Sequence, residues 1–302
     1  MKIGVIMGGI SSEREVSLSS GREILNHINF NGYEGVEIIL DTKTDIFEKV
    51  KGIDFALLAL HGKYGEDGTV QSILDSLEIP YSGCGMLSSA LCMDKDLTKT
   101  VLRNHGVRTA EWFVVKNATD VTKEMVESLK YPVVVKPNRG GSSVATFICK
   151  SFDEVVEGVK EGLKVDSEVM VEEFIKGDEI TVPILDGEAL PTLIIKPVKG
   201  GFFDYQSKYE DGGAEEVIIE YEEALQSVIN ELALTTFSAL KCDVYARVDF
   251  IVRDGVPYLL EINTLPGMTR TSLFPKSAKG IGLSYQGLLD RIIQSSLKLR
   301  AK

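Results

Sequence analysis

The sequence predicts an α/β protein built from more than one domain. Its first ninety residues alternate short apolar runs with helical patterns, which is typical of an open parallel sheet. Near its end, two runs rich in β-forming residues flank Asp254-Gly255, a strong signal for a β-hairpin. A length of 302 residues and a hydrophobic content of 44% are enough to fill two or three small cores.

Composition limits the classes of function. The formal net charge is -12, so a broad basic surface for nucleic acid or anionic lipid is not expected. No apolar run approaches the length of about 18 residues that a membrane span needs, and residues 2–7 read as a strand rather than a cleavable signal. We therefore expect a cytoplasmic protein that binds neither nucleic acid nor membrane. Scattered cysteines without a CxxC pair predict reduced, buried thiols: Cys84, Cys92, Cys149 and Cys242.

The first strand, residues 2–7, ends in Gly8-Gly9 and leads into a helix. Ser12 as N-cap and Glu15 at the third helical position match a capping box. Glu13 then lies in the first turn, where it either interacts only with the helix dipole or faces a ligand at the carboxyl edge of the sheet. The glycines do not form GxGxxG, so the pattern is not that of a dinucleotide-binding turn.

Further strands are predicted at residues 36–40 and 54–60, and a polar, glycine-rich loop follows them at residues 61–68. This loop is too polar for a buried element and is expected at the sheet edge. Its His61 is either structural or close to a substrate. After a break at residues 80–85, one helix over residues 88–105 is expected to carry Lys95, which faces either solvent or a nucleotide.

A glycine-serine turn, residues 140–143, follows a predicted strand that ends at Lys136. Its backbone N–H groups and the hydroxyls of Ser142 and Ser143 can bind phosphate, with Lys136 as a point charge beside them. Such turns are also common linkers, and the GxxxxGK[ST] pattern is absent. The position of Lys136 favours phosphate binding.

The rest of the chain is predicted to contain further helices and strands and one candidate lid. A helix is predicted at residues 153–163, and the residues of the strand at 169–175 by themselves are consistent with an exposed acidic edge. A hairpin is predicted from strands at residues 181–185 and 190–197. Residues 200–213, with glycines at both ends, are typical of a lid that closes over a substrate. Helices at residues 221–240 and 284–297 complete the chain, the last with an apolar stripe of Leu288, Leu289, Ile292 and Ile293.

The hairpin around Asp254-Gly255 allows two registers. A two-residue turn would set Asp249 opposite Leu260, away from Glu261. A three-residue loop with a G1 bulge would pair Val252 with Val256, and we predict this register because it gathers the polar side chains on one face. That face holds Arg247, Asp249, Glu261 and Asn263. The opposite, apolar face is expected to hold Val248, Phe250, Tyr258, Leu260 and Ile262.

Two carboxylates that share one strand face are costly to leave unpaired, and a divalent cation is a natural partner. The carboxylates of Asp249 and Glu261 and the amide oxygen of Asn263 are hard ligands, too few to enclose calcium. They suit Mg²⁺, which keeps waters and takes its other ligands from substrate phosphates. After this site, Pro266-Gly267 turns the chain so that the Gly267 amide can donate to an oxyanion. Ser272 can then bind a carboxylate.

The stretch LLEINTLPGMTRTSL, residues 259–273, resembles the signature of D-alanine-D-alanine ligases in the ATP-grasp superfamily. Three other stretches match the family in the same order: GGISSEREVSLSSG at residues 8–21, HGKYGEDG at residues 61–68, and MDK at residues 93–95. The resemblance covers nearly the whole chain. It departs at Gly140, where the family usually has Glu, and this change is expected to loosen the glycine-serine turn.

The resemblance implies a three-domain ATP-grasp fold. Residues 1–92 would form an N-terminal open parallel α/β, Rossmann-like domain, residues 93–178 a central domain, and residues 179–302 a C-terminal domain. ATP would lie between the last two. It also implies ligation of two D-alanine molecules through a D-alanyl phosphate for peptidoglycan precursors, with ATP, two Mg²⁺ (or Mn²⁺) and a homodimer. The alternatives are a related ligase that uses D-lactate or D-serine, another carboxylate-amine ligase, and a non-catalytic binding module.

The resemblance further implies residue roles. Glu13 would orient the ammonium of the first D-alanine, near His61. Lys95, Lys136, Ser142 and Ser143 would bind the ATP phosphates. Glu172, Phe174 and Ile175 would line the adenine slot, and Glu179 would hold the ribose. Lys208 and Tyr209 would meet phosphate and the Glu13–Ser142 pair. Arg247 and the Gly267 amide would stabilise the oxyanion, Ser272 would bind the second carboxylate, and Asp249, Glu261 and Asn263 would bind the metal ions.

Overall fold

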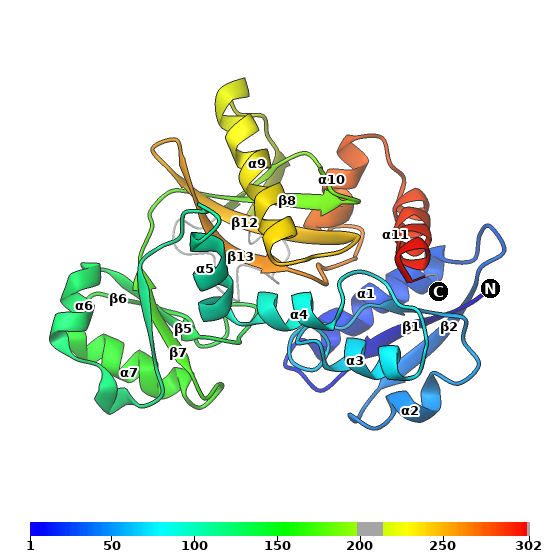
Figure 1. Ribbon diagram of the computed structural model, residues 1–302, viewed down its shortest axis with the longest axis horizontal. Helices are drawn as coiled ribbons and strands as arrows, with labels where there is room; N and C mark the ends of the chain where they lie inside the picture. The colour runs from blue at the N-terminus through cyan, green and yellow to red at the C-terminus, as the bar shows by residue number, and fades with distance from the viewer. Residues whose placement is uncertain (198–213, 301–302) are drawn as a thin grey trace.

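Three β-sheets with flanking helices make up the chain in the computed structural model, which describes residues 1–197 and 214–300 (Figure 1). The predicted lid and its Lys208 and Tyr209 lie outside the described residues. In those that are described, none of the helices is both long and apolar enough to cross a membrane. The predicted α/β class is confirmed.

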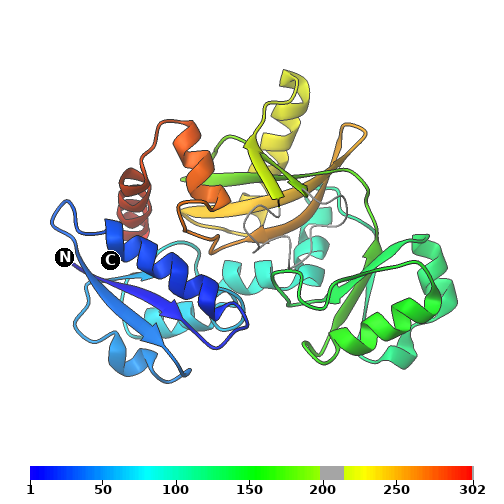
Figure 2. The same ribbon diagram turned by 180° about the vertical axis from the view of Figure 1, so that it is seen from behind.

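The first sheet is parallel, as predicted, with β1 (Lys2–Gly8) between β2 (Glu34–Leu40) and β3 (Phe55–Leu58). Its helices are α1 (Arg14–His27), α2 (Ile46–Lys49) and α3 (Thr69–Ser76). The last helix, α11 (Tyr285–Arg300), joins the same core through Leu288, Leu289, Ile292 and Ile293, which confirms the predicted stripe. The two chain ends consequently lie on one side of the molecule (Figures 1 and 2).

The start of α1 differs from the predicted capping box. Glu13, not Ser12, occupies the N-cap position, and no side chain caps the helix. The hydroxyl of Ser11 instead accepts from the Glu13 amide at 3.2 Å and donates to the His61 carbonyl at 2.7 Å. The prediction was wrong because Ser11 and Ser12 are equivalent in a local pattern, whereas only Ser11 reaches the loop after β3.

The helix predicted over residues 88–105 is two helices, α4 (Met86–Met93) and α5 (Lys95–Arg103). Asp94 between them is extended, with φ -91° and ψ 105°, and its carboxylate accepts from the Leu97 amide at 3.1 Å. Aspartate favours such N-cap positions because its short side chain bonds the backbone. After this break Lys95 is the first residue of α5, and its ammonium reaches the Gly140 carbonyl and the Glu261 carboxylate.

The second sheet is antiparallel and has the order β4-β7-β5-β6. Its strands are β4 (Trp112–Val115), β5 (Val133–Pro137), β6 (Phe147–Cys149) and β7 (Val169–Glu173). The short 3₁₀ helix η1 (Ala118–Asp120) and helices α6 (Lys123–Leu129) and α7 (Phe152–Gly162) complete this unit, which has its own valine-rich core. Figure 1 shows α6 and α7 beside this sheet.

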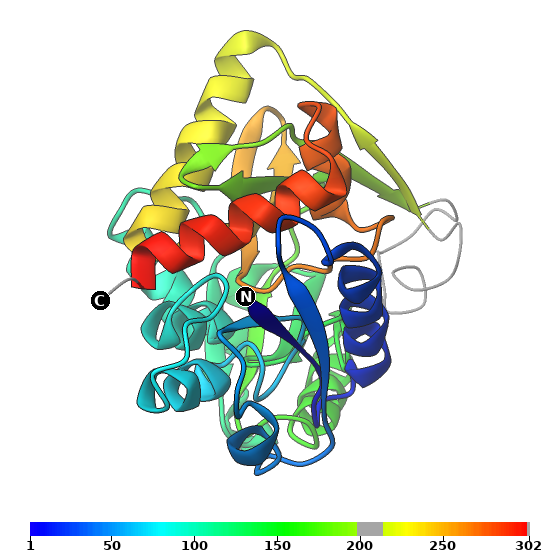
Figure 3. The ribbon, with the colours of Figure 1, turned by 90° about the vertical axis from the view of Figure 1, so that its right-hand side faces the viewer.

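The third sheet has the order β11-β10-β8-β12-β13, with β9 (Glu188–Ala189) paired to β8. It contains β8 (Asp178–Leu185), β10 (Leu193–Pro197), β11 (Ala214–Ile218), β12 (Tyr245–Arg253) and β13 (Val256–Asn263). The predicted hairpin of β8 and β10 is confirmed by antiparallel pairing of Thr181 with Leu193. Helix α9 (Glu223–Ala239) packs on β8 and β12, and α10 (Leu273–Gly280) lies between this sheet and α11 (Figure 3).

The β12–β13 register corrects the prediction. A two-residue turn closes the hairpin, with Arg253 opposite Val256 and with φ of 51° at Asp254 and 75° at Gly255. The register then shifts between Asp249 and Phe250, because Leu260 is an extra residue on β13. Asp249 therefore lies directly opposite Glu261, and Arg247 opposite Asn263. The polar side chains lie on one face of the hairpin, as expected. The cause is a bulge within β13 rather than a bulge in the loop.

The bulge also changes the apolar face. Val248, Phe250 and Ile262 are buried as predicted. Leu259, which is paired with Phe250 and 2% exposed, joins their core, whereas Tyr258 and Leu260 are not part of it and line a pocket that Leu259 also borders. The prediction for these two side chains was wrong because alternation was counted without the extra residue.

Candidate active site

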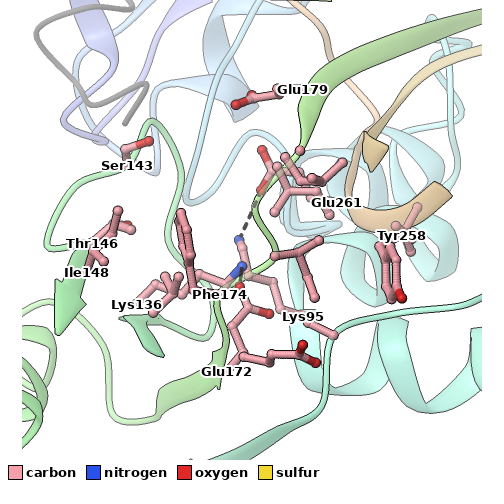
Figure 4. Close-up of a pocket in the computed structure, with 18 of the residues that line it drawn as sticks. Lys95, Lys136, Ser143, Thr146, Ile148, Glu172, Phe174, Glu179, Tyr258 and Glu261 are labelled. Carbon is pink, nitrogen blue, oxygen red and sulfur yellow. Dashed lines mark ion pairs between the residues drawn. The ribbon is translucent and has the colours of Figure 1, made fainter. Parts of the chain in front are cut away.

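A cavity of about 820 Å³ lies between the second and third sheets. Its walls come from strands of both sheets and from the segment that joins β7 to β8, including Phe174 and Ile175. Gly177 in this segment lies so close to β12 that an added Cβ would be 2.3 Å from the Val252 carbonyl oxygen, so no larger residue fits. The predicted nucleotide residues that line the cavity are Lys95, Lys136, Ser142, Ser143, Glu172, Phe174, Ile175 and Glu179. Figure 4 labels six of them, all but Ser142 and Ile175.

The floor of the cavity holds a buried group of charges. Glu172 on β7 is 4% exposed and pairs with Lys136 on β5 at 2.5 Å and with Lys99 on α5. Burial alone would raise the pKa of Glu172, but the two lysines outweigh it and hold the pKa at about 2. Burial lowers the pKa of Lys99 to about 8. The group keeps an excess of positive charge at the cavity, which suits a phosphate-bearing ligand.

Lys95 connects this cavity to the neighbouring acids. Its ammonium donates to the Gly140 carbonyl at 2.7 Å and lies 3.5 Å from the Glu261 carboxylate. Figure 4 shows the ammonium groups of Lys95 and Lys136 pointing toward Glu261 and Glu172. The side chain of Lys95 is 10% exposed, so its charge acts where water screens weakly.

The glycine-serine turn reaches across to the first sheet. The Ser142 hydroxyl donates to the Glu13 carboxylate, which joins two residues that the sequence resemblance had paired. Ser142 and Ser143 have φ of 51° and 57°, a left-handed backbone that costs an L-residue about 1 kcal/mol. The turn is thus held in a strained form with its hydroxyls beside the cavity.

The polar face of β12 and β13 reaches the cavity through Glu261, which lines it. Asp249 is 3% exposed, and its carboxylate accepts hydrogen bonds from the Arg247 guanidinium at 2.9 and 3.0 Å. It also accepts from the side-chain amide of Asn263 at 3.0 Å and from the Thr181 hydroxyl at 2.5 Å. Burial would lower the pKa of the Arg247 guanidinium, but the charge of Asp249 outweighs it and raises that pKa. Arg247 therefore remains a fixed cation beside the two carboxylates.

The donor set at this face fits a divalent cation. Asp249 and Glu261 form a direct cross-strand pair, and Asn263 follows two residues later on the same face. A cluster of three or more His, Cys, Asp or Glu side chains able to hold a metal does not occur in the described ranges. Two carboxylates and an amide oxygen would therefore leave positions for water and phosphate oxygens, as Mg²⁺ requires.

A second polar region adjoins Glu13. The Glu66 carboxylate accepts from the Gly62 amide at 2.5 Å, and burial, reinforced by the negative charge of Glu13, raises its pKa to about 8. His61 is 8% exposed, and its ring contacts the Ser20 hydroxyl and the Leu265 carbonyl. Burial lowers the pKa of His61. The carboxylates of Glu13 and Glu66 and the His61 ring thus lie close together at the carboxyl edge of the first sheet.

The predicted residues of the C-terminal turn lie near one another. An added Cβ on Gly267 would be 3.0 Å from the Ser272 hydroxyl oxygen, so the two residues are in close contact. The Ser272 hydroxyl also bonds Thr269, accepting from its amide at 3.1 Å. Ser272 stands at the N-cap of α10, where it can present its hydroxyl and the first helix amides to an anion.

Sequence reasoning missed several residues of this site. Lys99 lies four residues after Lys95 on α5, a spacing that puts both on one helix face and could have indicated it. Glu66 lies in the HGKYGEDG stretch at residues 61–68, but no role was predicted for it. Thr181 and Ser20 carried no signal, because a single hydroxyl in a strand or helix is common and only the tertiary fold brings each to its partner.

The strand arrangement and the lysine-lined cavity between two antiparallel sheets define an ATP-grasp protein. The family models described as "D-ala D-ala ligase C-terminus" and "D-ala D-ala ligase N-terminus" match residues 101–294 and 41–84. The chain belongs to the D-alanine-D-alanine ligase family.

Relatives of this family match over the full length. A D-alanine–D-alanine ligase of Clostridium perfringens is 60% identical over 99% of both chains. The crystal structure of the Bacillus anthracis ligase complexed with ATP has a TM-score of 0.89 at 47% identity, covering 99% of this chain and 98% of that one. The VanG D-Ala:D-Ser ligase of Enterococcus faecalis has a TM-score of 0.84 at 31% identity, covering 98% and 99%.

Proposed function

We propose that this protein joins two D-alanine molecules to D-alanyl-D-alanine and converts ATP to ADP and phosphate. The observation that carries the proposal is the contact between Ser142 and Glu13. Through this contact, the turn that would bind phosphate lies directly against the carboxylate that would hold an amino acid. The Bacillus anthracis relative binds ATP, and the Clostridium perfringens relative is named for D-alanine on both sides of the bond.

ATP would bind in the cavity between the second and third sheets. Phe174 and Ile175 offer apolar surface to the adenine, and Glu179 offers a carboxylate to the ribose hydroxyls. Lys95, Lys136 and the turn at residues 140–143 would hold the phosphates. Glu172 would fix Lys136 through their 2.5 Å ion pair rather than contact the phosphates, because a second anion there would repel them.

The first chemical step would activate a carboxylate. A carboxylate is a poor acyl donor, because its leaving group would be oxide. Phosphorylation of the carboxylate provides phosphate as a better leaving group. Glu13 would hold the ammonium of the first D-alanine. A carboxylate oxygen of this D-alanine would then attack the γ-phosphorus of ATP, and ADP would leave. Mg²⁺ or Mn²⁺ held by Asp249, Glu261 and Asn263 would neutralise the phosphate charge that builds up in this step.

The second step would form the peptide bond. The neutral amine of the second D-alanine would attack the acyl carbon, and the tetrahedral oxyanion would collapse with cleavage of the bond to phosphate, while the nitrogen loses one proton to the departing phosphate. Arg247 and the Gly267 amide are the donors that would stabilise this oxyanion. Ser272 at the N-cap of α10 would bind the carboxylate of the second D-alanine.

The test is phosphate release from ATP and Mg²⁺ with D-alanine, with products identified by mass. L-alanine, D-serine, and D-alanine with D-lactate serve as parallel substrates. Dipeptide formed from D-alanine alone supports the proposal. Turnover only with D-serine or D-lactate would keep the ATP-grasp chemistry and overturn the second substrate. Nucleotide binding without turnover would favour a binding module.

Three further properties belong to the same proposal. The metal ions are proposed from the donor set at Asp249, Glu261 and Asn263. A homodimer and a cytoplasmic location remain predictions from the sequence. Sedimentation of the purified protein tests the dimer, and cell fractionation tests the location.

A further inference from the structure

We propose that Ser20 and His61 form a hydrogen-bonded relay that positions the turn at residues 265–268 for catalysis. The inference rests on the proposed function, because that turn contains the Gly267 amide assigned to the oxyanion. In this role Ser20 and His61 are positioning residues: they act through the turn. His61 would then hold the turn that carries the Gly267 amide, without contacting the substrate itself.

The relay spans three separate parts of the chain. Ser20 lies within α1 and is 0% exposed, and His61 follows β3. The Ser20 hydroxyl oxygen lies 3.3 Å from His61 Nε2 and accepts from the Met268 amide at 3.4 Å. On the other side of the ring, His61 Nδ1 lies 3.1 Å from the Leu265 carbonyl oxygen. The two residues therefore hold both ends of the turn.

Chemistry fixes the direction of each hydrogen bond. A carbonyl oxygen can only accept, so His61 Nδ1 must carry the proton. In neutral imidazole Nε2 is then an acceptor, and the Ser20 hydroxyl donates to it. The Ser20 oxygen keeps a lone pair for the Met268 amide. One tautomer of His61 thus satisfies all three bonds.

The surroundings favour the neutral ring. Burial lowers the pKa of His61, and the positive charge of Arg247 on β12 acts in the same direction. The negative charge of Glu13 at the start of α1 and the hydrogen bond to the Leu265 carbonyl act in the opposite direction, but burial is the largest influence and the pKa is lowered overall. A protonated ring would also turn Nε2 into a donor and leave the Ser20 proton without an acceptor.

Other contacts make the relay stiff. The His61 carbonyl accepts from the Ser11 hydroxyl at 2.7 Å, so its backbone is tied to the segment before α1. The Met268 carbonyl accepts from the Tyr285 hydroxyl at 2.5 Å. Met268 is therefore held through its amide by α1 and through its carbonyl by α11. Such supporting bonds keep an oxyanion donor in place before the reaction begins.

Nitrogen NMR of ¹⁵N-histidine-labelled protein tests the relay without activity. The sequence has three histidines, and His61→Asn identifies the His61 signals by their loss. We expect Nδ1 protonated and Nε2 unprotonated at neutral pH. In Ser20→Ala the Nε2 signal should shift, because it loses its donor. A wild-type ring protonated on Nε2, or on both nitrogens, would overturn the relay.

Kinetics of Ser20→Ala and Ser17→Ala separate positioning from stability. Ser17 is one turn earlier on α1, equally buried, and bonds the Gly8 amide at 2.9 Å and the Ala59 carbonyl at 2.7 Å, away from the turn. We expect Ser20→Ala to lower kcat for the dipeptide about tenfold, with the KM for ATP unchanged. Ser17→Ala should keep the wild-type kcat.

Equal kcat losses in the two variants would overturn the relay, since a buried serine would then matter only for folding. Thermal unfolding of both variants measures that folding contribution separately. Wild-type protein that makes no dipeptide would refute the proposed function, while the ring protonation measured by NMR would still decide whether the relay exists.

Discussion

Asp249 lies directly opposite Glu261 across the β12–β13 ladder, although a two-residue turn closes that hairpin. Without the register shift at Leu260, a two-residue turn would set Asp249 opposite Leu260 and turn Glu261 to the other face. The bulge thus creates the pair of carboxylates on which the proposed metal site depends. Bulges are often found next to active sites because they re-aim one side chain without changing the sheet.

Glu261→Gln tests this pair. The amide keeps the size of the side chain but removes one anionic ligand, so we expect phosphate release to fall by roughly 100-fold. The fold should persist, as judged by circular dichroism. Glu215→Gln, which alters an exposed carboxylate on β11 of the same sheet, is the matched control. Wild-type activity of Glu261→Gln at saturating Mg²⁺ would refute the metal assignment.

Glu172 should make the protein sensitive to acid. Its pKa is about 2 when folded, against an ordinary value of 4.5, because Lys136 and Lys99 outweigh the effect of burial. A depressed carboxyl pKa stabilises the fold above pH 4.5, and this stability is lost as the pH falls toward 2. Glu172→Gln should cost about 3 kcal/mol at pH 7, since two buried lysines lose their partner.

Urea unfolding at several pH values measures this effect. The difference in unfolding free energy between wild type and Glu172→Gln should shrink as the pH falls from 4.5 toward 2. A difference that stays constant over this range would show that Glu172 does not hold a depressed pKa.

Glu66 should act in the opposite direction. Burial and the charge of Glu13 raise its pKa to about 8, above the ordinary 4.5. Its contribution to stability is complete below pH 4.5 and is lost as the pH rises through 8, by at most about 1.4 kcal/mol per pH unit. Glu66→Gln should therefore gain stability relative to wild type between pH 6 and pH 9. Parallel unfolding curves with no such gain would contradict the assignment.

Gly141→Ala should disturb Glu13. An added Cβ at Gly141 would lie 2.9 Å from the Glu13 carboxylate oxygen, so that carboxylate must move. We expect kcat/KM for D-alanine to fall about tenfold, as for one lost charge-assisted hydrogen bond. Gly85→Ala is the control, because its nearest atoms would be 3.9 Å away. Unchanged steady-state kinetics of Gly141→Ala would argue against Glu13 as the ammonium ligand.

Much of the fold could be predicted from local pattern. Parallel strands in the first sheet, the hairpin of β8 and β10, and the apolar stripe of α11 follow from hydrophobic periodicity, which tertiary packing here reinforces. The break at Asp94 could not be predicted, because an amphipathic pattern continues across it. The bulge at Leu260 was also hidden, since Leu259 and Leu260 are chemically alike and only packing decides which is buried.

The candidate site was predicted to a similar depth. Residues with a motif, such as Lys136 and Ser142, were found, and the structure places both at the cavity. Ser20 was not found, because its role comes from contacts with residues distant in sequence. The roles of individual site residues stay predictions, as do the domain limits at residues 92 and 178.

The central claim is that the carboxylate of one D-alanine becomes an acyl phosphate. The most direct test supplies D-alanine labelled with ¹⁸O in its carboxyl group, together with ATP and Mg²⁺, and follows the label by mass spectrometry. We expect D-alanyl-D-alanine and inorganic phosphate that carries one ¹⁸O atom, because the attacked carboxylate oxygen leaves with the phosphate. Unlabelled phosphate, or label recovered in AMP, would contradict the account.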